Sequence, residues 1–441
     1  MRKIAIMLLC LWQLSNLAAI DLDLTTAKKL ALKNNPSLLA EKEKYLASKS
    51  EKWNSLSNLL PSLQATAGHN RFYPEQTMGF QTAAEHSYSY GFTVNQPLFQ
   101  GGKLWLSSRI KNDAEKIAEA NYFAKKLETI AAVEEKYFSV LKNQKLLEIA
   151  RLDLKNSNTN LAIAATKYKA GIISKSDYLQ LKAEKSTKEV NLLQMQNLFE
   201  TQMLDLANFL QVEELNKVQF IKNDEYEKLL STLQAFELKT IKAKSKEIVE
   251  IGLSQNPTIK PLKLAVETGK KSVLMAGGNF LPSVNLSFSQ NYTKYNYMDD
   301  YEESGTLALS ASLPLFPILD NTSTLASAKH SLKKSEYTLI NTKQSIKLAL
   351  QNSFYTLVAN AKSLTSAQLA LEQAEETYQR MQNRFKSGLI SANELISIQT
   401  MLLSTKNEYY TTFFDFLQSK STLLQQMGLE KEEKLLSIIN K

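Results

Sequence analysis

The chain has 441 residues and a formal net charge of +9 at pH 7, with only 13 glycines and 9 prolines. This composition, rich in Ala, Leu, Lys, Glu, Gln and Ser, is typical of long helices with solvated faces and not of ordinary globular domains. Basic residues alternate with acidic ones, as in Glu41-Lys42-Glu43-Lys44, which argues against nucleic-acid binding.

The N-terminus has the pattern of a secretion signal, so residues 1–19 are predicted to be removed. Met1-Arg2-Lys3 is a basic head, an apolar run follows, and Leu17-Ala18-Ala19 offers a small-residue cleavage site. A short buried helix is the alternative. The only cysteine, Cys10, lies in the apolar run, so the mature chain would have none. No later stretch reaches the roughly 18 apolar residues of a spanning helix, so an exported protein would be soluble or would cross an outer membrane as strands.

Residues 20–245 are predicted to form a first structural repeat. Short helices end before Pro36 and Pro61, and then the apolar period changes to two, with Tyr88, Tyr90 and Phe92 alternating with polar residues. In chain order, the repeat contains these helices, a strand pair at about 62–98, a long helix at about 103–168, a helix at about 176–210 and a linker at 211–245.

Residues 246–428 are predicted to form a second repeat, and 429–441 a C-terminal tail. In the strands of the second repeat, apolar and polar residues alternate in the same way, with Leu286 and Phe288 on the apolar side of one strand and Leu307 and Leu309 on that of the next. Half-buried soluble strands also alternate, but the aromatic apolar face, the polar opposite face and the export signal favour a lipid-facing wall around a wet lumen. The repeat contains a strand pair at about 283–315, a long helix at about 321–384 and a helix at about 392–427.

Four landmarks recur in the same order with an offset of roughly 220 residues, which is the size of a duplicated domain. They are Asn35-Pro36 and Asn256-Pro257, Leu60-Pro61-Ser62 and Leu281-Pro282-Ser283, Pro97-Leu98-Phe99 and Pro314-Leu315-Phe316, and the turns from Tyr168 to Ser174 and from Phe385 to Ser391. Each long helix has about 65 residues, on the order of 100 Å, and needs partners along its length. The two shorter helices of the same repeat, stacked end to end, nearly match it, which predicts a four-column bundle.

The duplicated landmarks resemble those of the TolC family of outer-membrane efflux proteins (outer membrane factors), over about 22–428. Gly101-Gly102 after Gln100 completes the family's usual strand exit. The resemblance implies a mainly α fold with a transmembrane β-barrel portion, in which a homotrimer forms one 12-stranded barrel continuous with a long periplasmic α-helical barrel. The residues alone also require several copies, because four strands cannot close a barrel and about eight are the minimum.

The same resemblance implies a passive exit duct in the outer membrane of a Gram-negative bacterium, extending into the periplasm. Its partners would be a periplasmic adaptor, an inner-membrane pump and outer-membrane lipid. An outer-membrane component of type I protein secretion is the alternative within this class. A secreted soluble coiled-coil structural protein is the alternative from another class; it would explain the helices and the signal but not the duplicated strands.

Catalysis is not predicted. The three histidines, His69, His86 and His330, are scattered without metal-ligand spacing. No glycine-rich loop leads from a strand into a helix as a phosphate cradle, and no nucleophile lies near a base. We therefore expect no enzyme activity, no cofactor and no metal site.

The turns after the two long helices are the candidate sites. Ser174 with Asp177 and Ser391 with Glu394 have the spacing of capping boxes. The alternative is that three copies of each acid form a ring that attracts cations, and Glu394 best matches the position of such a ring in the family. The resemblance further assigns adaptor docking to Gly171, Ile172, Ile173, Ser174, Gly388, Leu389, Ile390 and Ser391.

The contacts that close the tip cannot be carried over from the better-known members of the family. Those members hold the tip closed with a Tyr, an Asp and an Arg. The matching positions in this chain are interpreted to be Phe385, Lys169 and Ile390. Phe385 has no hydroxyl and Lys169 reverses a charge, so a different contact, such as Lys169 with Glu394, would be needed. The pore and gate candidates are Glu394, Asp177, Lys169 and Phe385.

Overall fold

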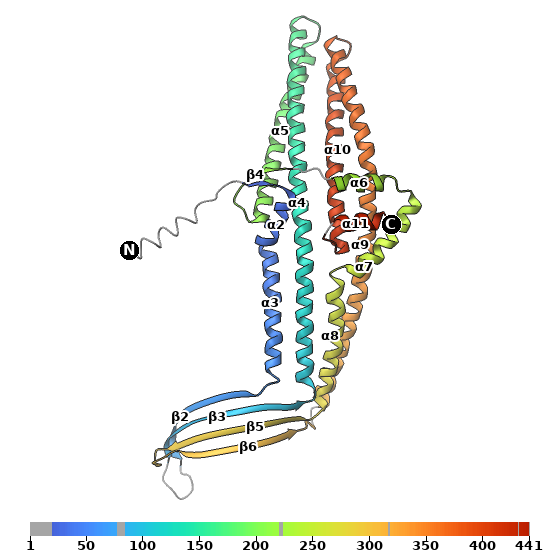
Figure 1. Cartoon of the computed structure of the whole chain (residues 1–441). Coiled ribbons are helices and arrows are strands. Elements are labelled where there is room, and N and C mark those ends of the chain that lie inside the picture. The colour runs from blue at the N-terminus through green and yellow to red at the C-terminus, as the bar shows by residue number, and fades with distance from the viewer. Residues whose placement is uncertain (1–19, 77–83, 220–223, 316–317, 431, 441) are drawn as a thin grey trace, which may run out of the picture. The chain divides into compact units, whose positions relative to one another are not determined.

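The computed structural model describes residues 20–76, 84–219, 224–315, 318–430 and 432–440. The predicted signal, with Cys10, lies outside these residues. The described chain is mainly helical with one larger sheet and one small one (Figure 1). None of its described helices is long and apolar enough to cross a membrane.

The first repeat of the sequence contains one short strand, two short helices, two long strands and two long helices. In chain order they are β1 (Ile20–Leu22), α2 (Leu24–Asn34), α3 (Pro36–Ser57), β2 (Ser62–Gln76), β3 (Ala84–Gln100), α4 (Lys103–Lys169) and α5 (Lys175–Leu210). The segment that the sequence leaves as a linker holds β4 (Leu215–Val218), α6 (Asp224–Gln234) and the start of α7 (Leu238–Gln255).

The second repeat has the same order of elements. It contains α8 (Ile259–Gly277), the short 3-10 helix η1 (Gly278–Phe280), β5 (Ser283–Tyr295), β6 (Glu302–Ser312), α9 (Ile318–Lys386) and α10 (Ala392–Met427). The tail holds one further helix, α11 (Glu432–Ile439).

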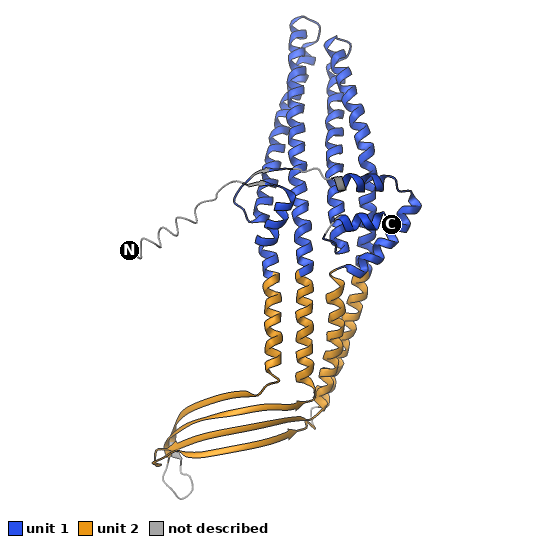
Figure 2. Cartoon of the chain, in the orientation of Figure 1, with its two compact units in different colours: residues 1–40, 123–256, 344–441 blue, residues 41–122, 257–343 orange. Residues whose placement is uncertain are grey.

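The elements form two compact units that do not coincide with the two repeats (Figure 2). Unit 1 comprises the residues up to 40 together with 123–256 and 344–441, and unit 2 comprises 41–122 and 257–343. Each repeat contributes to both units, because helices α3, α4 and α9 have residues in each.

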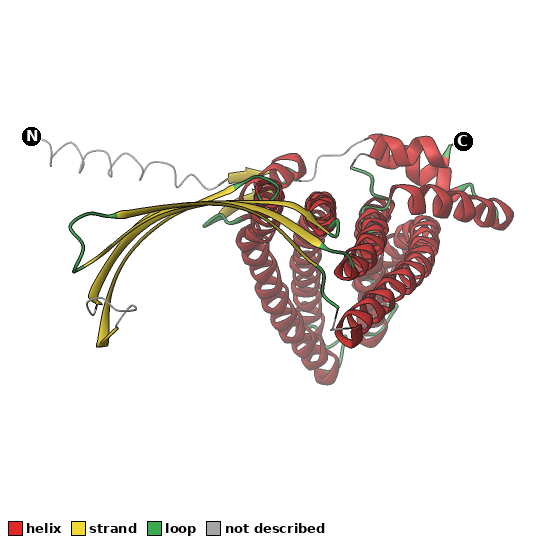
Figure 3. Cartoon of the chain, turned by 90° about the horizontal axis from the view of Figure 1, so that it is seen from below, coloured by secondary structure: helices red, strands yellow, loops and turns green. Residues whose placement is uncertain are grey.

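Unit 2 contains the four-stranded sheet, in the order β2-β3-β5-β6 with every pair antiparallel. Figure 3 shows these strands as one curved layer. One row across the sheet joins Leu63, Val94, Phe288 and Leu307, and the next row joins Gln64, Thr93, Ser289 and Thr306. Because neighbouring rows point to opposite faces, one face is apolar and the other polar, as the alternation predicted.

The apolar face of this sheet is exposed to its surroundings. Leu63 is 72% exposed, Leu307 71% and Leu309 69%. Aromatic rings pair across the strands, with Tyr90 stacked on Tyr292 at 5.0 Å between ring centroids. A continuous exposed apolar surface of this kind marks an interaction with lipid or with another apolar surface.

The junction of strands and helices in unit 2 depends on a close approach of two glycines. Gly101 has φ +60°, and a Cβ atom there would lie 2.2 Å from the carbonyl oxygen of Gly278. Beside it, Lys103 donates to Asn279 at 2.9 Å, and the buried Asp113 of α4 is paired with Lys271 of α8. The two repeats are therefore fastened together next to the sheet.

Unit 1 is organised around a larger apolar core. The strands β1 and β4 pair in parallel, and Tyr137 of α4, 1% exposed, donates to the carbonyl oxygens of Leu22 and Gln219 beside them. Leu435 and Ile439 of α11 are buried in the same core. The linker and the tail thus pack on the middle of the long helices.

Candidate pore tip

The two turns that follow the long helices have the same geometry. Gly171 has φ +72° and Gly388 has φ +77°, a left-handed conformation that a side chain would strain. The N–H of the next residue, Ile172 or Leu389, donates to the carbonyl oxygen five residues earlier at 2.9 Å in both turns. This helix ending is the one that favours glycine at its left-handed position, which explains why the sequence repeats it.

Both predicted capping boxes are confirmed. The hydroxyl of Ser391 accepts from the N–H of Glu394 at 3.2 Å, and the carboxylate of Glu394 accepts from the N–H of Ser391 at 2.8 Å. Ser174 and Asp177 make the same reciprocal pair at 3.0 and 3.2 Å. The backbone and hydroxyl hydrogen bonds from Ser391 lower the pKa of Glu394, because they stabilise its charged form.

The docking candidates divide into exposed and anchored residues. Ile172 is 63% exposed and Leu389 66%, whereas Ile173 and Ile390 are partly buried against a local core. No atom lies within 4 Å of the place where a Cβ would stand on Gly171. Each turn therefore presents one apolar side chain outward and holds the next one inward.

That local core, here called the tip core, is built by all four helices that end in the turns. Its buried members are Ala164, Leu181, Ala374, Tyr378, Phe385, Ala392, Leu395 and Leu402. Phe385 is 1% exposed. The structure therefore places this gate candidate inside the core of its own chain.

Within the described part of the chain, the contact considered for Lys169, an ion pair with Glu394, is not formed, and Lys167, which the sequence analysis did not single out, instead contacts Phe385 of the other repeat. Lys169 is exposed, and the carboxylate of Glu394 is bound by Ser391. The buried Lys167 donates to the carbonyl oxygen of Phe385, and its ammonium lies 4.6 Å from the centroid of that ring. Burial lowers the pKa of Lys167. No local signal distinguishes Lys167 from Lys169, because its partner Phe385 lies 218 residues away in the sequence.

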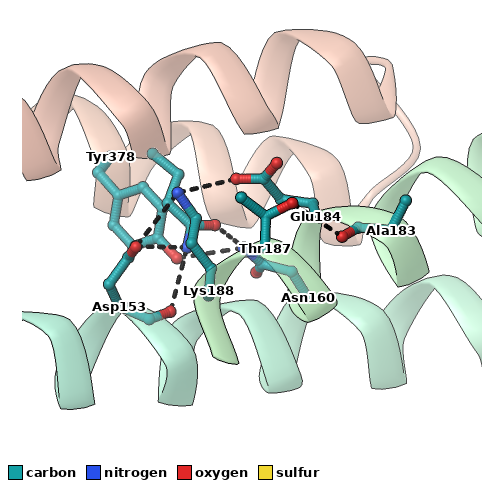
Figure 4. Close-up of polar contacts among 8 residues, drawn as sticks. Asp153, Asn160, Ala183, Glu184, Thr187, Lys188 and Tyr378 are labelled. Atoms are coloured by element: carbon teal, nitrogen blue, oxygen red, sulfur yellow. Dashed lines mark hydrogen bonds and ion pairs between the residues drawn. The ribbon is translucent and has the colours of Figure 1, made fainter. Parts of the chain in front are cut away.

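A second group that sequence reasoning missed is a buried polar cluster farther along the same helices. Asp153 and Asn160 of α4, Lys188 of α5, Tyr378 of α9 and Gln399 of α10 are all buried. Figure 4 shows Lys188 between Asp153 and Glu184, with Asn160 and Tyr378 nearby. Lys188 lies 3.2 Å from Asp153 and 2.8 Å from Glu184. Burial would lower the pKa of Lys188, but its hydrogen bond to Glu184 and the two carboxylate charges outweigh burial and raise it.

The expectation that the three histidines lie apart is wrong for His69 and His86, which lie side by side. Antiparallel pairing sets His69 opposite Tyr88 and Arg71 opposite His86, so the two imidazoles meet diagonally, with Nε2 of His69 3.1 Å from Nδ1 of His86. Among the described residues, no group of three or more His, Cys, Asp or Glu side chains could hold a metal ion.

Comparison with known proteins identifies the family. The model of the outer membrane efflux protein family matches residues 28–210 and 249–429. The alkaline protease secretion protein AprF of Pseudomonas aeruginosa is 21% identical over 429 residues, covering 95% of this chain and 86% of AprF. The outer membrane protein TolC of Vibrio cholerae is 20% identical over 416 residues, covering 92% of this chain and 91% of TolC.

The fold agrees with this assignment. The crystal structure of the Campylobacter jejuni CmeC outer membrane channel matches with a TM-score of 0.78 at 16% identity, covering 95% of this chain and 89% of CmeC. At that identity the likeness shows the fold alone, which is that of a mainly helical channel protein with a small sheet. Since the family model matches each repeat across its strands, long helix and turn, the chain belongs to the outer membrane efflux protein family.

Proposed function

We propose that this chain is the passive outer-membrane exit duct of a tripartite efflux system and that three copies assemble to form it. Family membership gives the coarser part directly: an outer-membrane channel protein of efflux or secretion systems that extends into the periplasm. Membership of this family also excludes the alternative of a soluble coiled-coil structural protein.

The observation that carries the proposal is the sheet of unit 2. It has an exposed apolar face and two open edges, β2 and β6. Open edges are not tolerated in lipid, because their unpaired N–H and C=O groups have no water to bind. Pairing β6 of one copy with β2 of the next removes both edges. Eight strands from two copies would leave a lumen filled by side chains, whereas twelve from three copies leave room for passage.

The tip supplies the proposed sites for partners and for the gate. Ile172 and Leu389 are exposed apolar side chains beside glycines, which suits the docking of an adaptor's helical hairpins. Three copies of Glu394, and in a weaker form of Asp177, would line the bore with carboxylates. We propose Lys169 as a further charge at the tip, and Phe385 as the residue that shapes it from within. Energy would come from the inner-membrane pump.

A protein-secretion outlet is the second candidate. The observation that favours it is the 21% identity with AprF, a protein named for alkaline protease secretion, over 95% of this chain. TolC of Vibrio cholerae matches at 20%, so identity does not separate the two candidates. Identifying the pump that co-purifies with the cross-linked protein would distinguish an efflux duct from a protein-secretion outlet.

The test is export from cells that lack the gene and carry it back on a plasmid. We expect the protein in the outer-membrane fraction, and we expect cells that express it to extrude a fluorescent dye or to secrete a protease that the deletion strain retains. A matched control is Leu309→Arg, which places a charge on the exposed apolar face. Full export of both dye and protease by the deletion strain, or recovery of the protein in the soluble periplasm, would overturn the proposal.

A further inference from the structure

The exposed apolar face of the sheet changes in character along its strands. Near the helices of unit 2 its side chains are aliphatic, as at Leu63 and Leu307. Farther along the strands, on the same face, Tyr90 lies opposite Tyr292 with the rings stacked at 5.0 Å between centroids. The hydroxyl of Tyr292 donates to Glu303 at 3.3 Å. Tyrosines on the outside of a transmembrane barrel mark the boundary between hydrocarbon and headgroups, so the hydrocarbon would end at this pair.

Beyond the tyrosine pair, the same face carries basic side chains. One row of the sheet joins His69, Tyr88 and Lys294, and the next row on this face sets Arg71 opposite His86. His69 is stacked on Tyr88 at 4.6 Å between ring centroids, and its Nε2 lies 3.1 Å from Nδ1 of His86. We call His69, His86, Arg71 and Lys294 the basic patch. It lies toward the end of the sheet away from the helices of unit 2 (Figure 2).

The basic patch carries more positive than negative charge. Arg71 pairs with Glu85 at 3.0 Å and lies 4.5 Å from the ring centroid of Tyr73, and Glu85 also lies 3.4 Å from His86. Lys294 donates to a backbone carbonyl between β5 and β6, which is a neutral acceptor. In the described contacts of the patch, two side chains that are cationic at neutral pH therefore meet one carboxylate. A guanidinium also has five N–H donors, and the pair with Glu85 uses one of its nitrogens.

The basic patch is open on the outer face of the sheet. The side chain of Arg71 is 50% exposed, and His69 is exposed as well. Pairing of β2 with a strand of another copy would use the backbone edge of β2, which leaves this face uncovered. Because the apolar face continues directly into the patch, a lipid that lies on that face would bring its headgroup to these side chains.

We propose that the basic patch binds the phosphate groups of lipopolysaccharide, the glycolipid of the outer leaflet. The proposal rests on the proposed function, which sets the apolar face in the outer membrane. The helices extend into the periplasm, so the far end of the sheet lies in the outer leaflet. Acyl chains would lie along the aliphatic side chains and the tyrosine pair. The phosphates would accept charge-assisted hydrogen bonds from Arg71 and Lys294, with the imidazoles beside them.

Lipid binding by the purified protein tests the site without any substitution. The delipidated protein in mild detergent would be titrated with diphosphorylated lipid A, the anchor of lipopolysaccharide, and bound lipid would be counted by native mass spectrometry. Dephosphorylated lipid A, phosphatidylglycerol and inorganic phosphate are the comparison ligands. We expect diphosphorylated lipid A to bind about tenfold or more tighter than its dephosphorylated form, because two charge-assisted contacts are lost with the phosphates.

The comparison ligands decide what the site recognises. Equal affinity for the two forms of lipid A, or for phosphatidylglycerol and diphosphorylated lipid A, would overturn the proposal. Displacement of lipid A by inorganic phosphate at equal concentration would overturn it as well, since the acyl chains would then contribute nothing on the apolar face.

A double variant locates the binding on the patch. Arg71→Gln/Lys294→Gln should weaken binding of diphosphorylated lipid A by about tenfold or more and leave the dephosphorylated form unaffected. The matched control is Lys239→Gln/Lys242→Gln, which removes two charges from exposed positions of α7 and should bind like the parent. Unchanged binding in the patch variant would overturn the site.

Failure of this proposal is distinguishable from failure of the duct. A parent protein that conducts across a bilayer but does not prefer phosphorylated lipid A would remove the lipid site and leave the duct intact. A protein that never enters the outer membrane would count against the duct itself.

Discussion

Gln399 and Asp153 lie 2.7 Å apart, from Nε2 to Oδ1, and this hydrogen bond joins the last long helix of the second repeat to the long helix of the first. Both side chains are buried, Gln399 at 3% exposure and Asp153 at 6%. The contact shows how a duplicated sequence becomes one structural unit: the repeats meet through polar groups whose partners lie about 250 residues away.

Replacing Gln399 should therefore weaken the tip without changing the fold. We expect Gln399→Leu to lower the free energy of unfolding by about 1–3 kcal/mol, because it leaves Asp153 and Asn160 without their shared partner. Thermal and denaturant unfolding of the detergent-purified protein measures this. The exposed neighbour Thr400 supplies the control, since Thr400→Ala should be nearly neutral. Equal stability of Gln399→Leu and the parent would show that the buried polar cluster does not stabilise the packing of α4 against α9 and α10.

The two faces of the sheet should differ in their tolerance of charge. Leu309 lies opposite Leu286 on the apolar face, and the next residue, Ser310, lies opposite Asn285 on the other face. We expect Leu309→Arg to impair assembly, at a cost of roughly 2–4 kcal/mol at the middle of a membrane, while Ser310→Arg assembles normally. Heat-resistant oligomers in outer-membrane fractions measure assembly. Equal yields of both variants would mean that the apolar face does not meet lipid.

The turn glycines should matter for the partner more than for the fold. Gly388→Trp strains a left-handed position by about 1–2 kcal/mol and places a bulky group beside Leu389. We expect assembled protein that no longer cross-links to its adaptor or exports. Gly388→Asn is the matched variant, because asparagine tolerates this conformation without comparable bulk, and it should keep most export. If Gly388→Trp exports normally, this turn does not dock the adaptor.

The pH dependence of Glu394 distinguishes its two roles. Within one chain the cap lowers its pKa below the ordinary 4.5, so the cap is intact above that value and is lost only as pH falls through the lowered pKa. Three carboxylates converging on a bore would repel one another and raise the pKa instead. We expect block of the channel by multivalent cations to weaken as the pH falls and Glu394 takes up a proton, and we expect Glu394→Gln to abolish that pH dependence. Unchanged block in Glu394→Gln would leave Glu394 as a helix cap alone.

The sequence predicted those parts of the fold that depend on local periodicity. The alternation through Leu307 and Leu309 indicates a strand with one apolar face, and the structure has β6 with both side chains exposed on one side. The turn glycines and the serine caps were readable because their chemistry is local: a left-handed residue, and a hydroxyl three residues before an acid.

The buried polar residues of α4 could not be predicted in this way. The apolar steps through Leu147, Leu154 and Leu161 indicate a helix, but the buried positions beside them include Asp153 and Asn160. From the sequence alone, a polar residue on a helix is expected to face solvent. The partners that allow Asp153 and Asn160 to be buried lie on α9 and α10, far away in the sequence. The meeting of His69 with His86 was missed for a related reason, since it depends on the register of β2 against β3.

The most direct test of the proposed duct is single-channel recording of the purified protein in a planar lipid bilayer. We expect discrete conductance steps from a trimer, a preference for cations, and loss of insertion in Leu309→Arg but not in Ser310→Arg. A protein that remains a monomer, or that inserts without conducting under any condition that opens its relatives, would contradict the proposal.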